Sequence, residues 1–129
     1  IHGPVLGNNT GVGISIWVRT AVASDVVVHI MNRDRVAVTG KSSSRSSKDT
    51  DFTAVVRVEG LRPDTEYWYS MVINGIAHPA KFTLRTLPKA HAAAKFRVAF
   101  GGGAGYVPQN EIMWNTIAKA EPAADAVNA

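Results

Sequence analysis

The fold is decided by residues 60–69, which run Gly-Leu-Arg-Pro-Asp-Thr-Glu-Tyr-Trp-Tyr. Pro63 and Asp64 favour a turn, and Leu61 precedes it, where a chain crossing between two β-sheets fills their shared core. Tyr67 comes next at the position of a tyrosine corner, whose hydroxyl bonds to the backbone a few residues upstream. This stretch therefore predicts a sandwich of two sheets, and the role it predicts for Tyr67 is stability and not catalysis.

Alternating apolar and polar residues predict strands on both sides of this stretch. The expected strands are residues 12–18, 25–31, 35–39, 52–58, 65–73 and 80–86. Asn74-Gly75 predicts a tight hairpin turn, and the residues 40–51, rich in Ser and Lys, are expected to form the longest loop. About seven short strands separated by turns are typical of a mainly β fold, a β-sandwich of the fibronectin type III or immunoglobulin-like kind.

The strand predicted at residues 12–18 indicates the core most clearly. The inward residues are expected to be Val12, Ile14, Ile16 and Val18, joined by Phe52, Ala54, Val56 and Val58 from a later strand. Trp17 falls on the other face of its strand, because successive side chains point to opposite sides. The sequence allows two placements: Trp17 covers the outside of the sheet, or a bulge turns it inward.

A different pattern begins after Leu87-Pro88. A strand is expected at residues 96–100, a glycine loop at 101–105 and a helix at 109–120, in the order typical of the start of an α/β domain. The segment is too short to close a core of its own. The predicted domains are a fibronectin-like β-sandwich at 1–87, a linker at 88–95 and a truncated β-loop-α start of an α/β domain at 96–129.

Composition narrows the class of protein. The 129 residues are 46% hydrophobic and 19% charged, as in ordered globular proteins. No apolar run reaches the roughly 20 residues that cross a bilayer, and residues 1–4 lack the features of a signal peptide. The net charge is +4, but its only local cluster is Lys41, Arg45 and Lys48 among serines, which is expected to be a solvated loop. Without a basic stripe and stacking aromatics, no nucleic-acid site is expected.

The order of these segments resembles the front end of PhoD-type alkaline phosphatases, a family of metal-dependent phosphomonoesterases and phosphodiesterases. The matching stretches are Gly3-Pro4-Val5, Trp17-Val18-Arg19-Thr20, residues 60–69, residues 82–88 and residues 96–101. The resemblance implies that a fibronectin-like domain precedes a metallophosphoesterase domain, of which residues 96–129 hold the first strand and helix. It implies a parent that binds two metal ions (Ca, Fe or similar), hydrolyses a phosphate ester and is periplasmic or secreted.

Two departures from the family pattern limit what can be carried over. Family members often have Ser-Cys, with the cysteine as a metal ligand, where this chain has Gly102-Gly103. The family's Gly-Asp motif is expected just after Asp125, past the last residue of the sequence. No catalytic or metal-ligating residue is therefore assigned, and the fragment is expected to be inactive without the remainder of the catalytic domain as its partner.

The glycine loop supplies the only candidate site residues. Glycines let backbone N–H groups approach a phosphate, and a helix N-terminus adds a favourable partial charge. Gly102, Gly103 and Tyr106 are therefore candidates for the rim of the parent's active site, with an ordinary flexible loop as the alternative.

The histidines predict no metal site, and a second function stays open. The four histidines, His2, His29, His78 and His91, stand far apart, with no partner at the spacing of metal ligands. The alternative to an enzyme part is a stand-alone fibronectin-type binding or adhesion module. That module is expected to bind carbohydrate if Trp17 and Trp68 both face outward on one surface.

Overall fold

The computed structural model describes residues 1–38 and 42–95 of the chain. The chain divides into two compact units, residues 1–93 and 94–129, and the first unit holds all the strands described. The strand, glycine loop and helix predicted between residues 96 and 120 lie outside the described residues.

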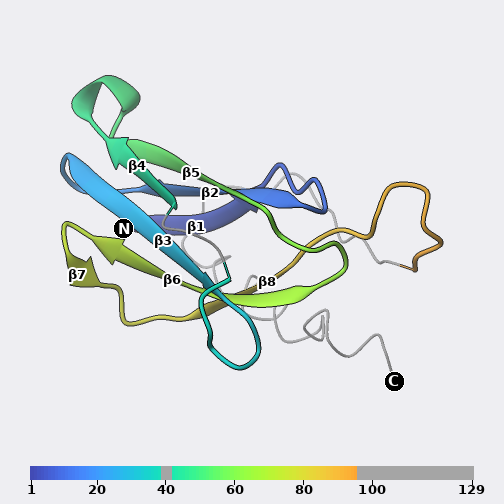
Figure 1. The fold of residues 1–129 in the computed structure, drawn as a ribbon. Coiled ribbons are helices and arrows are strands. Elements are labelled where there is room, and N and C mark those ends of the chain that lie inside the picture. Colours follow the sequence, from blue (N-terminus) through green and yellow to red (C-terminus); the bar gives the residue numbers. More distant parts are fainter. Residues whose placement is uncertain (39–41, 96–129) are drawn as a thin grey trace, which may run out of the picture. The chain divides into compact units, whose positions relative to one another are not determined.

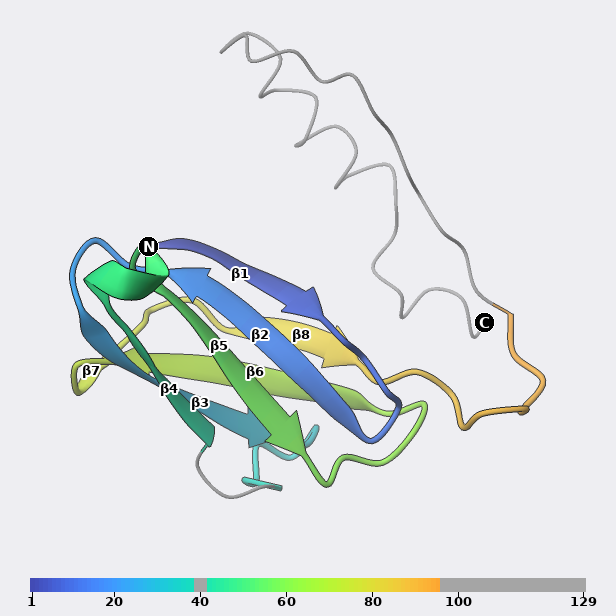
Figure 2. The ribbon, with the colours of Figure 1, turned by 90° about the horizontal axis from the view of Figure 1, so that it is seen from above.

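The described part of the chain is a β-sandwich (Figure 1). Its strands are β1 (His2–Gly7), β2 (Gly13–Arg19), β3 (Ser24–Met31), β4 (Ser42–Ser46), β5 (Thr53–Glu59), β6 (Glu66–Ile73), β7 (Ile76–Ala77) and β8 (Phe82–Arg85). A three-stranded sheet has the order β1-β2-β5, and a five-stranded sheet has the order β4-β3-β6-β7 with β8 also paired to β6. Figure 2 shows the two sheets as two layers. Every strand pairing is antiparallel, and the prediction of a mainly β sandwich is confirmed.

Alternation along the strands builds the core between the sheets. The buried apolar residues are Ile14, Ile16, Val18, Val26, Val28, Ile30, Ala54, Val56, Val58, Leu61, Tyr67, Tyr69, Met71 and Leu84. Val12 was expected among them but is 48% exposed, because β2 begins only at Gly13. Phe52 is also only partly buried, since it lies in the turn before β5 with a left-handed φ of 57°.

The tyrosine corner is confirmed. The backbone N–H of Arg62 donates a hydrogen bond of 2.9 Å to the Tyr67 hydroxyl, and Leu61 is 4% exposed, as expected of a core residue. The predicted hairpin at Asn74-Gly75 is also present, and both residues have positive φ, 48° and 79°. Such a turn matches the twist of its two strands, so β6 runs directly into β7.

Two predictions around residue 40 are wrong. Residues 35–38 form no strand beyond a single bridge between Met31 and Ala37. Arg35 has a left-handed φ of 61°, and its N–H bonds to the carbonyl of Asn32, which makes a turn here instead. The segment expected to be the longest loop contains β4 and a short 3₁₀ helix, η1 (Lys48–Thr50). Polar Ser42–Ser46 form a strand because β3 offers an open edge whose backbone groups need partners.

Strand β1 is an element that the sequence patterns did not predict. It pairs with β2 at the edge of the three-stranded sheet, with Val5 opposite Trp17 and Leu6 opposite Ile16. All but one of its residues are exposed, so the strand has no regular alternation of buried and exposed positions to reveal it.

Within residues 1–38 and 42–95, no helix has the length and apolar character to cross a membrane.

Candidate functional site

The candidate rim residues Gly102, Gly103 and Tyr106 lie outside the described residues, so their placement stays a prediction. The described residues offer no place for the metal pair that the resemblance implies. No group of three or more His, Asp or Glu side chains in residues 1–38 and 42–95 is placed to hold a metal ion, and the chain has no cysteine. This part of the chain does not fit a metal centre.

The histidines lie on separate elements. His2 is in β1 of one sheet, and His29 is half-buried on the outer face of β3 in the other, opposite Ser70. His78 follows β7, where its Nδ1 accepts a hydrogen bond of 3.3 Å from the Ala80 backbone. His91 is exposed beyond the last strand. Because the four histidines lie on separate elements and none belongs to a group of three or more possible metal ligands in the described residues, we assign none of them a catalytic role.

Four ion pairs join charged side chains in the described part of the sandwich. Arg19 pairs with Asp51 at 2.8 Å, Arg33 with Glu66 at 3.1 Å, Arg45 with Asp25 at 3.0 Å and Arg85 with Asp64 at 3.0 Å. Surface pairs of this kind add little to stability and create no reactive group. The pairing also shows that the predicted basic cluster is not a free loop, because Arg45 lies in β4 and is partnered across the sheet.

One buried group titrates away from its ordinary range. Burial raises the pKa of Tyr69 to about 12, so the phenol stays protonated at any physiological pH. Its ring stacks on Phe82 with centroids 5.2 Å apart. Tyr69 is therefore a core residue and a poor candidate for acid–base chemistry.

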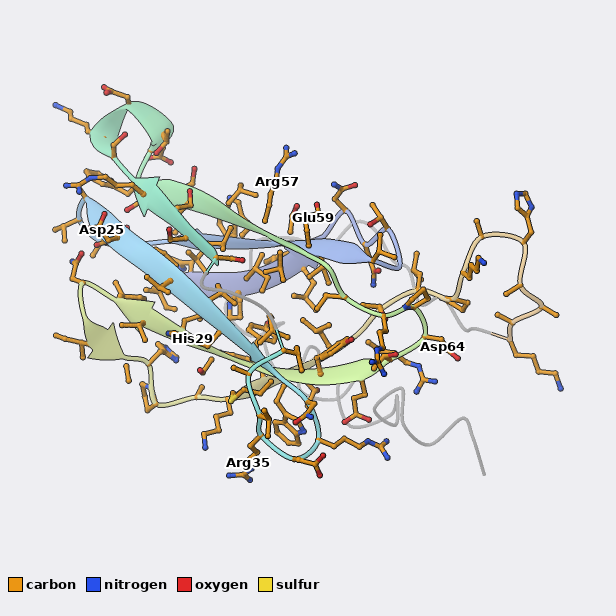
Figure 3. The ribbon with its side chains drawn as sticks, viewed as in Figure 1. Asp25, His29, Arg35, Arg57, Glu59 and Asp64 are labelled. Atoms are coloured by element: carbon orange, nitrogen blue, oxygen red, sulfur yellow. The ribbon has the colours of Figure 1, made fainter. Side chains whose placement is uncertain are left out.

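The outer face of the three-stranded sheet carries an apolar row that crosses all three strands. Trp17 lies opposite Val5 on one side and Val55 on the other. Val5 is 55% exposed and Val55 is 46% exposed, so Trp17 covers the outside of the sheet and is not turned inward by a bulge. Arg57 and Glu59 project from β5 on the same face (Figure 3). Part of this row was missed because β1 was not predicted.

The two tryptophans considered for sugar binding do not share a surface. Trp68 pairs with Met31 on the outer face of the five-stranded sheet, whereas Trp17 is on the outer face of the other sheet. The core of the sandwich separates them. They cannot form one aromatic platform, so the observation that favoured carbohydrate binding is lost.

Comparison with known proteins gives one family and two similar structures. A family model described as "Domain of unknown function (DUF7800)" matches residues 1–85. A structure of PhoD has a TM-score of 0.58 and 17% identity over 69% of this chain, and the match covers 19% of the PhoD chain. At that identity the likeness shows a shared fold, and this chain spans only about a fifth of the PhoD chain.

The second structure is the sensor domain of the anti-sigma factor RsgI4 from Pseudobacteroides cellulosolvens. It has a TM-score of 0.44 and 16% identity, over 64% of this chain and 89% of that one. Comparison with curated proteins finds no match.

Proposed function

The chain belongs to the DUF7800 family, and from that premise we propose that it is the N-terminal accessory part of a PhoD-like, metal-dependent phosphomonoesterase or phosphodiesterase. The observation that carries the proposal is the fold shared with PhoD over 69% of this chain. The order of motifs, from the tyrosine corner at Tyr67 to the restart after Pro88, supports the same interpretation.

In this proposal the sandwich supplies no chemistry. Its described residues offer no set of metal ligands, and its one strongly perturbed group, Tyr69, is a protonated core phenol. The metal ions, Ca, Fe or similar, and the groups that hold the phosphate ester belong to the remainder of the catalytic domain. Gly102, Gly103 and Tyr106 are proposed for the rim of that site, and the parent is proposed to be periplasmic or secreted.

The first test is to read the coding sequence past the Ala129 codon. The proposal expects an open frame that soon encodes Gly-Asp-Asn, the motif that supplies a bridging carboxylate in the PhoD family, and later further Asn and His ligands. A stop codon in place of that frame overturns the proposal.

The second test is enzymatic. The protein made from the longer frame is expected to hydrolyse p-nitrophenyl phosphate or bis(p-nitrophenyl) phosphate, and to lose the activity in EDTA. The chain of 129 residues alone is expected to show no turnover with added Ca²⁺, Fe³⁺ or Mn²⁺. Turnover by this chain that survives repurification contradicts the accessory role.

A stand-alone binding or adhesion module is the second candidate, and the row Val5–Trp17–Val55 is the observation that favours it. In that case the module is expected to keep its melting temperature when residues 96–129 are removed. Replacing Val5 and Val55 by Ser should then abolish the binding of a partner to this surface without unfolding the sandwich, because neither side chain is in the core.

A further inference from the structure

The chain leaves the sandwich through a segment that one asparagine helps to hold. Strand β8 ends at Arg85, and one further backbone hydrogen bond, from the Thr86 N–H to the Thr65 carbonyl at 3.0 Å, continues the pairing by a residue. The Asn9 side-chain amide also binds this segment: its Nδ2 donates to the Arg85 carbonyl at 2.9 Å, and its Oδ1 accepts from the Leu87 N–H at 3.0 Å. The same Oδ1 accepts from the Gly11 N–H at 3.1 Å, which fixes the loop that presents it.

A second loop holds the same segment by other atoms. The Asp64 N–H donates to the Leu87 carbonyl at 3.0 Å, and the Asp64 carboxylate accepts from Arg85 Nε at 3.0 Å. Between these contacts Thr86, only 1% exposed, donates through its hydroxyl to the Arg62 carbonyl at 2.6 Å. Residues 85–87 are therefore bonded to both the β1–β2 loop and the β5–β6 loop.

Gly11 shows that the fit of the first loop against the exit is close. Its φ is +84°, and a Cβ placed there would lie 3.0 Å from the Leu87 carbonyl oxygen and 3.4 Å from that of Pro88. Both views of the ribbon show the β1–β2 loop beside the chain that leaves β8 (Figures 1 and 2). A larger residue at position 11 would push the exit away from its hydrogen-bond partners.

We propose that Asn9, Gly11, Asp64 and Thr86 form an exit latch, which fixes the direction in which the chain leaves the sandwich as far as Pro88. The Leu87 side chain adds little to the core, since it is 52% exposed. A strand end held only by its ladder would fray, whereas here these five hydrogen bonds to two loops hold residues 85–87. The sandwich is thus a rigid mount, and any joint to the rest of the chain begins after Leu87.

This inference does not depend on the proposed enzymatic function, and its test measures backbone opening. Amide hydrogen exchange is followed by NMR in the whole chain, comparing Leu87 with the core amides of Val28 and Met71. In the wild type, Leu87 is expected to exchange slowly although it lies outside any strand. Asn9→Ala should speed Leu87 exchange at least about tenfold, the effect of losing the bonds made by one side chain, while the ratio between the core amides stays unchanged.

Matched variants separate the latch from a general loss of stability. Asn8→Asp alters the neighbouring residue, which has a left-handed φ that Asp tolerates, and should leave Leu87 protected. Asn9→Asp keeps the acceptor oxygen but puts a second oxygen in place of the Nδ2 that donates to the Arg85 carbonyl, so Leu87 should exchange faster than in the wild type. Trypsin should cut after Arg85 faster in Asn9→Ala than in Asn8→Asp. Rapid Leu87 exchange in the wild type, or equal exchange in wild type and Asn9→Ala, overturns the proposal.

Discussion

The replacement Tyr67→Phe tests the interaction that identified the fold. The phenol ring is buried, at 4% exposed, and phenylalanine keeps that ring, so the change opens no cavity. What it removes is the acceptor of the Arg62 N–H, a bond of 2.9 Å in a partly buried position. An N–H left without an acceptor in such a place costs about 1–3 kcal/mol. For a domain of this size, about 2 kcal/mol corresponds to roughly 10 °C in Tm.

The matched control is Tyr69→Phe, on the same strand and the same buried face. Within the described ranges the Tyr69 hydroxyl makes no hydrogen bond, and its ring is held by stacking on Phe82. Removing an unpaired buried hydroxyl should leave stability unchanged or raise it slightly. Thermal unfolding monitored by circular dichroism gives both shifts. If Tyr67→Phe lowers Tm no more than Tyr69→Phe does, the corner hydrogen bond contributes nothing and the reasoning fails.

Three further outcomes are expected. Burial raises the pKa of Tyr69 from 10.0 to about 12, so between these pH values the folded state keeps a proton that the unfolded chain loses. The free energy of unfolding is therefore full below pH 10 and falls by up to about 2–3 kcal/mol as pH rises through about 12. In urea unfolding across this range, the free energy of unfolding of Tyr69→Phe should fall less steeply with pH than that of the wild type. Ser46→Ala should lower the free energy of unfolding by about 1–3 kcal/mol, because the fully buried Ser46 hydroxyl bonds to Thr20 Oγ1 and to the Ser24 N–H. The control Ser43→Ala, on the exposed side of β4, should unfold at the wild-type urea midpoint. EDTA should leave the Tm of the sandwich unchanged, because the described residues offer no metal site; a shift in Tm restored by Ca²⁺ or Mn²⁺ would contradict that.

The sequence predicted those elements whose causes lie close together in the chain. Alternation along β2 and β5 is a local pattern that results directly from burying one face of a strand. The tyrosine corner is also local, since Arg62 and Tyr67 are five residues apart. Both depend on neighbouring residues alone, so no knowledge of the rest of the fold was needed.

The elements that were missed depend on distant partners. Strand β4 is made of serine and arginine and exists because β3 needs a neighbour, so its own composition gives no apolar period. The contact between Asn9 and Leu87 joins residues 78 positions apart, and no local pattern marks Asn9 as different from Asn8. The candidate rim at Gly102, Gly103 and Tyr106 remains a prediction, since it lies outside the described residues.

The placement of polar groups supports an accessory role for the sandwich. At one end, the hydroxyls of Thr20, Ser24 and Ser46 bond to one another's groups and to the backbone between the sheets. At the other end, Thr86 donates to the Arg62 carbonyl and Asn9 accepts from the Leu87 N–H, and both bonds hold the segment through which the chain leaves the sandwich. A nucleophile or general base needs a side chain that is accessible and free to react, and these buried polar groups are committed to the backbone instead. In the proposed longer enzyme these groups are therefore expected to hold the fold, and the reactive groups are expected to lie in the remainder of the catalytic domain.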